Sequence, residues 1–157
     1  MKVSFKILFL VVVSGMLISL SGCKKPNPTP PTPEEEQLAK LSQTWKIKTV
    51  TLDGASKTAE YTGFTLVLSG TAGASSYSYT TTGRPSTSPW PASGQWTFGA
   101  DPLSDVIRDP SSTADKLNMK YTVTDTQLTI GFNFTGTGYN ARTAVVKGAW
   151  IYTFDKQ

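Results

Sequence analysis

Residues 117–134 read LNMKYTVTDTQLTIGFNF, and this stretch decides the fold class of the chain. Apolar side chains alternate with polar ones from Leu117 to Val123 and again from Leu128 to Phe134. A period of two is typical of β-strands with one buried and one exposed face. The polar segment Thr124-Asp125-Thr126 between the two runs predicts a tight turn. We therefore predict an antiparallel hairpin here.

The same alternation extends outward from the hairpin in both directions. A change of phase near Thr49 predicts a β-bulge in the first run, and the polar residues that follow it, up to Glu60, predict a loop. The further predicted strands cover residues 45–52, 64–68, 77–80, 95–98, 105–109 and 146–154.

Eight predicted strands, with no helical period between any two of them, define an all-β class. Short connections favour antiparallel neighbours, and eight strands are enough to close a barrel that leaves no exposed edge. We predict an up-and-down barrel, with a two-sheet β-sandwich as the alternative. A short helix is predicted over Glu34–Leu41, with Thr32 as N-cap and with Leu38 and Leu41 against one end of the domain.

The N-terminus has the pattern of a secretory signal. Lys2 and Lys6 precede an apolar run from Ile7 to Leu20, which is short for a membrane-spanning helix. The next residues, Leu20-Ser21-Gly22-Cys23, resemble the lipobox of bacterial lipoproteins. This resemblance implies that residues 1–22 are a signal peptide and that Cys23 carries a diacylglycerol and an N-acyl chain such as palmitate. Two or more acyl chains anchor a protein stably to a membrane.

The resemblance also implies a location in the cell envelope, at the outer membrane, because Lys24 rather than Asp follows the cysteine. Residues 24–33 read KKPNPTPPTP and predict an extended linker. The predicted organisation is a signal peptide (1–22), a lipidated cysteine with its Pro-rich linker (23–33) and a β-barrel domain (34–157).

Composition argues against several classes of function. Removal of residues 1–22 leaves 13 basic and 11 acidic side chains, too even a balance for a nucleic-acid-binding patch. The chain has no histidine, which excludes Ser-His-Asp and Cys-His nucleophiles and all His-containing metal sites. The acids do not form a calcium-loop pattern, and the glycine-rich stretches lack a P-loop lysine. We predict no catalytic residues, no metal and no cofactor.

Aromatic side chains are the remaining candidates for a site. Twelve of them fall on the inward phase of the predicted strands, and we expect most of these to form the core. Tyr77, Tyr79, Trp90 and Trp96 are the candidate ligand-binding residues, because they lie near loop ends or between prolines. Tyr61, Trp90 and Tyr139 are predicted in loops or at edges, and Trp90 is either a binding platform or a lid on the barrel end. The twelve inward residues are Trp45, Phe64, Tyr77, Tyr79, Trp96, Phe98, Tyr121, Phe132, Phe134, Trp150, Tyr152 and Phe154.

The region from Leu38 to Lys156 resembles the lipocalin-like domains of small bacterial lipoproteins. The segments that carry this resemblance are the opening helix with LSQTW (41–45), WPASGQW (90–96), the 121–134 hairpin and GAWIYTF (148–154). In lipocalins a Gly-x-Trp begins the first strand, and its tryptophan often packs under an arginine. Gln43 replaces that glycine here, and either Arg108 or Arg142 is available as the arginine.

The resemblance implies a barrel that binds rather than catalyses. Our first hypothesis is a lipid-anchored module whose barrel mouth holds a small apolar or amphipathic ligand. The alternative is an accessory lipoprotein with a filled barrel that engages another envelope protein through its loops or outer face. An interior with no void of ligand size, about 300 Å³ or more, would count decisively against the first hypothesis.

Overall fold

The structure is a computed structural model that describes residues 29–139 and 146–157. The predicted signal peptide, Cys23, the linker as far as residue 28 and Arg142 lie outside the described residues. Within the described ranges, no helix has the length and apolar character needed to span a membrane. Residues Pro31–Gln157 form one unit, which holds all the helices and strands that the structure describes.

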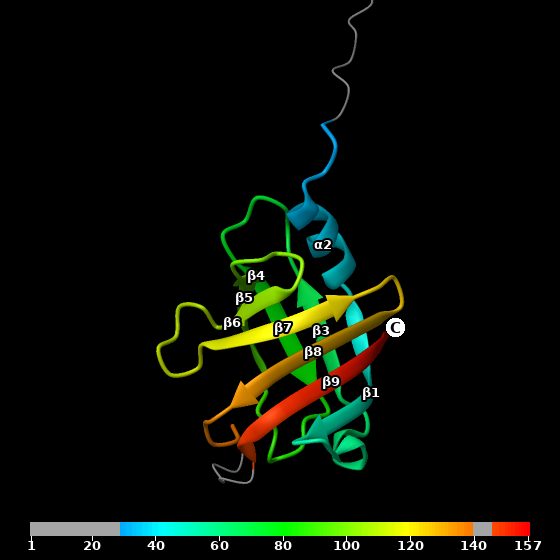
Figure 1. Cartoon of the computed structure of the whole chain (residues 1–157), viewed down its shortest axis with the longest axis vertical. Helices are drawn as coiled ribbons and strands as arrows, with labels where there is room; N and C mark the ends of the chain where they lie inside the picture. The colour runs from blue at the N-terminus through cyan, green and yellow to red at the C-terminus, as the bar shows by residue number, and fades with distance from the viewer. Residues whose placement is uncertain (1–28, 140–145) are drawn as a thin grey trace, which may run out of the picture. The chain divides into compact units, whose positions relative to one another are not determined.

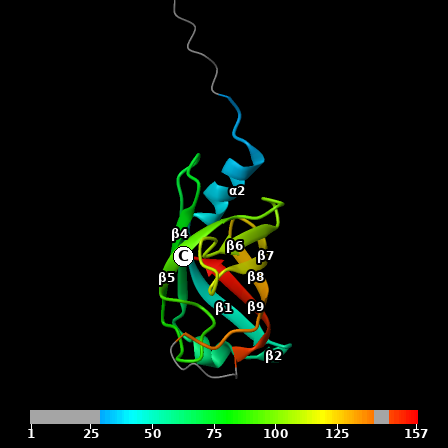
Figure 2. The same cartoon turned by 90° about the vertical axis from the view of Figure 1, so that its left-hand side faces the viewer.

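Eight antiparallel strands close into one barrel (Figure 1, Figure 2). Strand β1 pairs with β3, and from β3 onward each strand pairs with the next one in the chain. The barrel closes because β9 also pairs with β1, from Trp45 opposite Lys156 to Leu52 opposite Trp150. The up-and-down barrel predicted from the sequence is confirmed, and the two-sheet sandwich is not formed. The barrel strands are β1 (Thr44–Leu52), β3 (Thr65–Ser69), β4 (Tyr77–Thr82), β5 (Ser93–Phe98), β6 (Asp105–Arg108), β7 (Leu117–Val123), β8 (Gln127–Phe134) and β9 (Gly148–Lys156).

Each barrel strand lies where the alternation predicts one, with small differences at the ends. The bulge near Thr49 is confirmed, since the register of β1 against β9 shifts between Ile47 and Thr49. The shift brings Val50 to the buried face that Trp45 also occupies. The loop predicted up to Glu60 is wrong in part, because it contains the short strand β2 (Ala55–Ser56), paired with β1, and the 3-10 helix η1 (Thr58–Tyr61).

The barrel interior is filled by aromatic rings. All twelve rings predicted on the inward phase are buried. Tyr61 was predicted in a loop or at an edge, but η1 turns it inward, where it is fully buried. Its hydroxyl accepts a hydrogen bond from Tyr152 at 2.9 Å, which pairs two buried polar groups that would otherwise be unsatisfied.

Helix α2 (Pro33–Leu41) covers one end of the barrel, which we call the helix end (Figure 1). The helix begins at a capping box, in which Thr32 and Glu35 each bond the other's backbone N–H. Leu38 and Leu41 are buried as predicted. The indole of Trp45 donates to the carbonyl of Leu41 at 2.9 Å, which ties the helix to the start of β1.

The connections β4–β5, β6–β7 and β8–β9 meet at the opposite end, which we call the loop end. Trp90, in the β4–β5 connection, turns into the barrel and is 1% exposed. Its ring makes edge contacts with Tyr79, Phe132 and Tyr152, at centroid distances of 5.8 to 6.1 Å. Of the two roles predicted for Trp90, its burial fits the lid, because the ring fills the loop end of the barrel.

Candidate functional site

The four rings predicted to bind a ligand all lie in the core. Tyr77, Tyr79, Trp90 and Trp96 are each 5% exposed or less. Tyr79, Trp90 and Trp96 surround an enclosed void of about 10 Å³, which is room for about one water molecule. Tyr77 lies toward the helix end, where its hydroxyl is 3.4 Å from a Glu34 carboxylate oxygen. The interior described here therefore offers no space of ligand size, and the open pockets lie elsewhere.

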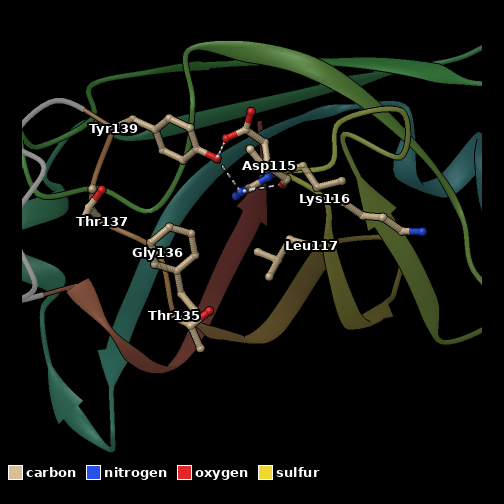
Figure 3. A pocket seen from close by; sticks show the side chains of 11 residues that line it. Asp115, Lys116, Leu117, Thr135, Gly136, Thr137 and Tyr139 are labelled. Carbon is tan, nitrogen blue, oxygen red and sulfur yellow. Dashed lines mark hydrogen bonds between the residues drawn. The ribbon is translucent and has the colours of Figure 1, made fainter.

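A pocket of about 420 Å³ opens at the loop end (Figure 3). We call it the loop-end pocket. It is lined by Arg108 at the end of β6, by residues 114–117 up to the start of β7, and by residues 134–139 at the end of β8 and just after it. The strand order brings these segments together, since β6, β7 and β8 are neighbours in the barrel. Its volume lies within the range of about 300–1,000 Å³ that is usual for small-molecule sites.

Arg108 connects the segments that form the wall of this pocket. Its side chain is 1% exposed and follows Val106 on the inward phase of β6. One terminal nitrogen, Nη1, donates to the carbonyl of Pro89 at 2.9 Å, and the other, Nη2, donates to the hydroxyl of Tyr139 at 3.0 Å. Its Nε lies 3.4 Å from the carboxylate of Asp109. One side chain thus joins the β4–β5, β6–β7 and β8–β9 connections.

Two aromatic rings flank the same guanidinium. Its central carbon lies 5.4 Å from the ring centroid of Trp90 and 5.6 Å from that of Tyr139. A cation at this distance from a ring is attracted by the ring's electron-rich face, more strongly where water is excluded. The positive charge is therefore compensated by two rings and by the carboxylate of Asp109.

Asp115 and Tyr139 form a second pair at the pocket wall (Figure 3). The hydroxyl of Tyr139 donates to one Asp115 oxygen, Oδ1, at 2.9 Å, and Ser112 donates to the other, Oδ2, at 3.1 Å. Burial is the main cause that raises the pKa of Tyr139 to about 12, with the bond to Asp115 adding to it and the charge of Arg108 opposing it. The phenol is therefore neutral at physiological pH and remains a hydrogen-bond donor.

A smaller depression of about 290 Å³ is also lined by this pair. Asp115 and Tyr139 line both spaces, and we call this shared wall the ridge. Asp109, which also lines the depression, accepts from the hydroxyl of Tyr79 at 2.8 Å and from the backbone N–H of Gln95 at 3.0 Å. Both of its oxygens are thus used by the protein.

The arrangement at the loop end is suited to binding. Both carboxylates, of Asp109 and Asp115, accept hydrogen bonds from hydroxyl or N–H donors, and the phenol of Tyr139 is neutral and donates. In the described ranges, the side chains form no cluster of three or more acidic, cysteine or histidine groups that would hold a metal ion.

A different open space lies on the outer face of β6 to β9. This outer groove of about 630 Å³ runs past Ile107, Gly131 and Ile151. Ile151 is 49% exposed, which is unusual for a large apolar side chain in this domain. Gly131 lies on the groove and carries no side chain, which leaves the space above it open.

Sequence reasoning did not assign the loop-end pocket, although one signal was present. Arg108 stands two residues after Val106, so a charged side chain occupies an inward position of a strand. Of the two arginines left open for the lipocalin pattern, Arg108 packs on Trp90, whereas the first-strand tryptophan, Trp45, bonds the helix. Tyr139 and Asp115 lie in connections, where no periodicity marks a site.

The fold and the site define a closed eight-stranded up-and-down β-barrel with a polar pocket at its loop end. A scan against protein-family models, a search of curated proteins and a search of solved structures found no match for this chain. The likeness to lipocalin-like lipoproteins therefore stays a prediction from the sequence.

Proposed function

We propose that this protein is a lipid-anchored lipoprotein of the cell envelope whose barrel binds a small amphipathic ligand in the loop-end pocket. The observation that carries the binding function is a pocket of 420 Å³ built around the buried Arg108, in a domain whose interior void is only about 10 Å³. The anchor rests on the signal pattern and on Cys23 at the end of a lipobox-like segment. The Lys24 that follows favours the outer membrane.

The topology of the domain is compatible with this arrangement. The polypeptide enters the barrel through α2 at the helix end, whereas the pocket lies at the loop end. An anchor that precedes α2 would therefore attach to the end of the barrel opposite the pocket. Tethering would leave the pocket accessible to a ligand.

Mass spectrometry of the full chain, extracted gently from its own membrane, tests both parts. We expect an acyl mass on Cys23 and a small molecule that copurifies with the chain. The variant Ala114→Trp, which places a large ring in the pocket, should lose this molecule. Thr113→Trp, at the neighbouring position that does not line the pocket, should retain it.

Two outcomes would overturn the proposal. An unmodified Cys23 thiol in the mature chain would remove the anchor. A copurifying molecule retained equally by Ala114→Trp, or the absence of any such molecule, would remove the binding function of the loop-end pocket.

A second candidate function is engagement of another envelope protein through the outer groove. The groove favours it because most of its exposed lining is apolar, including Ile107 and Ile151, and contiguous apolar surface is typical of interaction sites. Crosslinking from a photoreactive residue at position 133 would test it. Gly131→Leu fills the groove and should abolish capture of a partner. Thr122→Leu faces outward beyond the groove and should leave capture unchanged. Equal capture by both variants would exclude this surface.

A further inference from the structure

We infer that the ligand of the loop-end pocket is a neutral oligosaccharide, laid across the ridge formed by Tyr139 and Asp115. This inference rests on the proposed function and adds to it the chemical class of the ligand. It follows from the polar and apolar groups that line the pocket, and from the hydrogen bonds that its charged groups already make within the protein.

Two of the three charged residues that line the pocket, Arg108 and Asp115, are occupied by partners within the protein, and the third is Lys116. Arg108 donates to Pro89 and Tyr139, and both oxygens of Asp115 accept from Tyr139 and Ser112. Lys116 extends away from this cluster (Figure 3). A charged group placed beside Arg108 and Asp115 would lose its water without meeting a free counter-charge at that place, which is unfavourable. The site therefore favours a ligand without net charge.

A purely apolar ligand fits the remaining lining poorly. The hydroxyls of Thr135 and Thr137 line the pocket and, among the residues that the structure describes, neither is bonded to another protein group. Covering them with hydrocarbon would leave them without partners. Each hydroxyl of a sugar both donates and accepts, so a sugar can satisfy such groups.

The pocket also offers apolar surface of the kind that packs against a sugar ring. The side chain of Leu117 lines it, and the rings of Phe134 and Tyr139 lie 6.5 Å apart, tilted by 40°. The C–H face of a pyranose is flat and apolar, whereas its rim carries the hydroxyls. Hydroxyl groups beside aromatic surface thus match both parts of such a ligand.

The smaller depression of about 290 Å³ determines how many sugar rings we expect the ligand to have. It shares Tyr139 and Asp115 with the loop-end pocket, and its wall also includes Gln95 and Ser111. A single sugar ring would occupy the loop-end pocket alone, whereas a longer chain would cross the ridge and continue past Ser111. We therefore expect a trisaccharide to bind more tightly than a monosaccharide.

Saturation-transfer NMR of the full chain, in a detergent without sugar groups, tests this inference. The probes are maltotriose, cellotriose and chitotriose, with glucose and N-acetylglucosamine as single rings. We expect saturation transfer to at least one trisaccharide. Ala114→Trp should weaken that binding about tenfold or more, because its ring takes the ligand's volume. Thr113→Trp should change it less than about twofold, as expected for a surface position.

Two variants test the chemistry rather than the volume. Thr137→Val keeps the shape of the side chain but removes its hydroxyl, and it should weaken trisaccharide binding about two- to tenfold. Ser111→Trp should weaken binding of the trisaccharide while leaving that of its single ring unchanged. Equal affinity of Thr137→Val and the unmodified chain for the trisaccharide would overturn the sugar assignment.

The outcomes separate this inference from the proposed function. If none of these sugars binds, while the chain extracted from its membrane carries another molecule that Ala114→Trp removes, the inference is overturned and the proposed function stands. If Ala114→Trp changes neither the binding of a sugar nor the retention of a copurifying molecule, both the inference and the proposed function are overturned.

Discussion

The guanidinium carbon of Arg108 lies 5.4 Å from the ring centroid of Trp90. The charged group in the wall of the loop-end pocket therefore packs on the ring that fills this end of the barrel. Trp90 in turn contacts Phe132 and Tyr152 in the core. The pocket wall and the aromatic core are therefore one continuous packing unit. A change at either residue should affect both stability and the geometry of the pocket.

Replacing Arg108 by methionine should destabilise the domain by about 3 kcal/mol, because it leaves the Asp109 carboxylate and the Pro89 carbonyl without their buried partner. Urea denaturation measures the free energy of unfolding. Lys46→Met, at an exposed position of β1, is the matched control and should change it by less than about 0.5 kcal/mol. Equal stability of the two variants would show that Arg108 does not hold the loops.

Replacing Trp90 by alanine should lower the free energy of unfolding by about 3–5 kcal/mol, the usual effect of removing a large buried ring. Trp90→Phe should lower the free energy of unfolding by less, because the smaller ring keeps part of the edge contacts with Tyr79 and Phe132. Thermal unfolding followed by circular dichroism would rank the two variants. If Trp90→Ala unfolded at the temperature of the unmodified chain, the Trp90 ring would have no role in stability.

Much of the barrel could be predicted because each strand carries its own pattern. The alternation in 117–134 depends only on which face of a strand is buried, and the phase change near Thr49 marks the bulge in the same local way. The helix start was predictable from Thr32 and Pro33 for a similar reason, since a cap acts within one turn.

The loop end could not be predicted in this way, because its contacts join distant connections. Tyr139 reaches Asp115 across 24 positions and Arg108 across 31, and only closure of the barrel brings them together. Trp90 and Tyr61 lie in segments rich in turn-forming residues, so their burial depends on the open barrel end that they fill. The inward phase of Arg108 was the one local signal.

Two glycines should respond in opposite ways to alanine. Gly83 has a φ of +66°, and an added Cβ would lie 2.3 Å from the carbonyl oxygen of Gly63, so Gly83→Ala should destabilise by about 1–3 kcal/mol. At Gly131 the nearest atom to an added Cβ is the Trp150 carbonyl oxygen at 3.8 Å, so Gly131→Ala should be neutral or stabilise by about 0.5–1 kcal/mol. Chemical denaturation of both variants checks the pair. A reversed order would contradict the backbone geometry described here.

Alkaline pH should destabilise the barrel through its buried tyrosines. Burial raises the pKa of Tyr61, Tyr79, Tyr121 and Tyr152 in the folded state, whereas tyrosines in the unfolded chain titrate near pH 10. Above about pH 10 the unfolded chain therefore loses protons that the folded chain retains, and the free energy of unfolding falls as pH rises. Below that pH these groups are neutral in both states and cause no change.

The ultraviolet absorbance of tyrosinate, recorded as pH is raised, would check this effect. We expect the buried tyrosines to ionise only together with loss of the folded signal in circular dichroism. The urea-unfolded chain, as control, should titrate smoothly near pH 10. Complete ionisation near pH 10 with the fold intact would contradict the burial of these rings.

The most direct test of the binding site is a crystal structure of the chain extracted from its own membrane with its copurifying molecule bound. We predict density for that molecule in the loop-end pocket, in contact with Thr137 and Tyr139, with Arg108 still bonded to Pro89. Density for the molecule inside the barrel, between Tyr79 and Trp96 with Trp90 displaced, would contradict binding at the loop end.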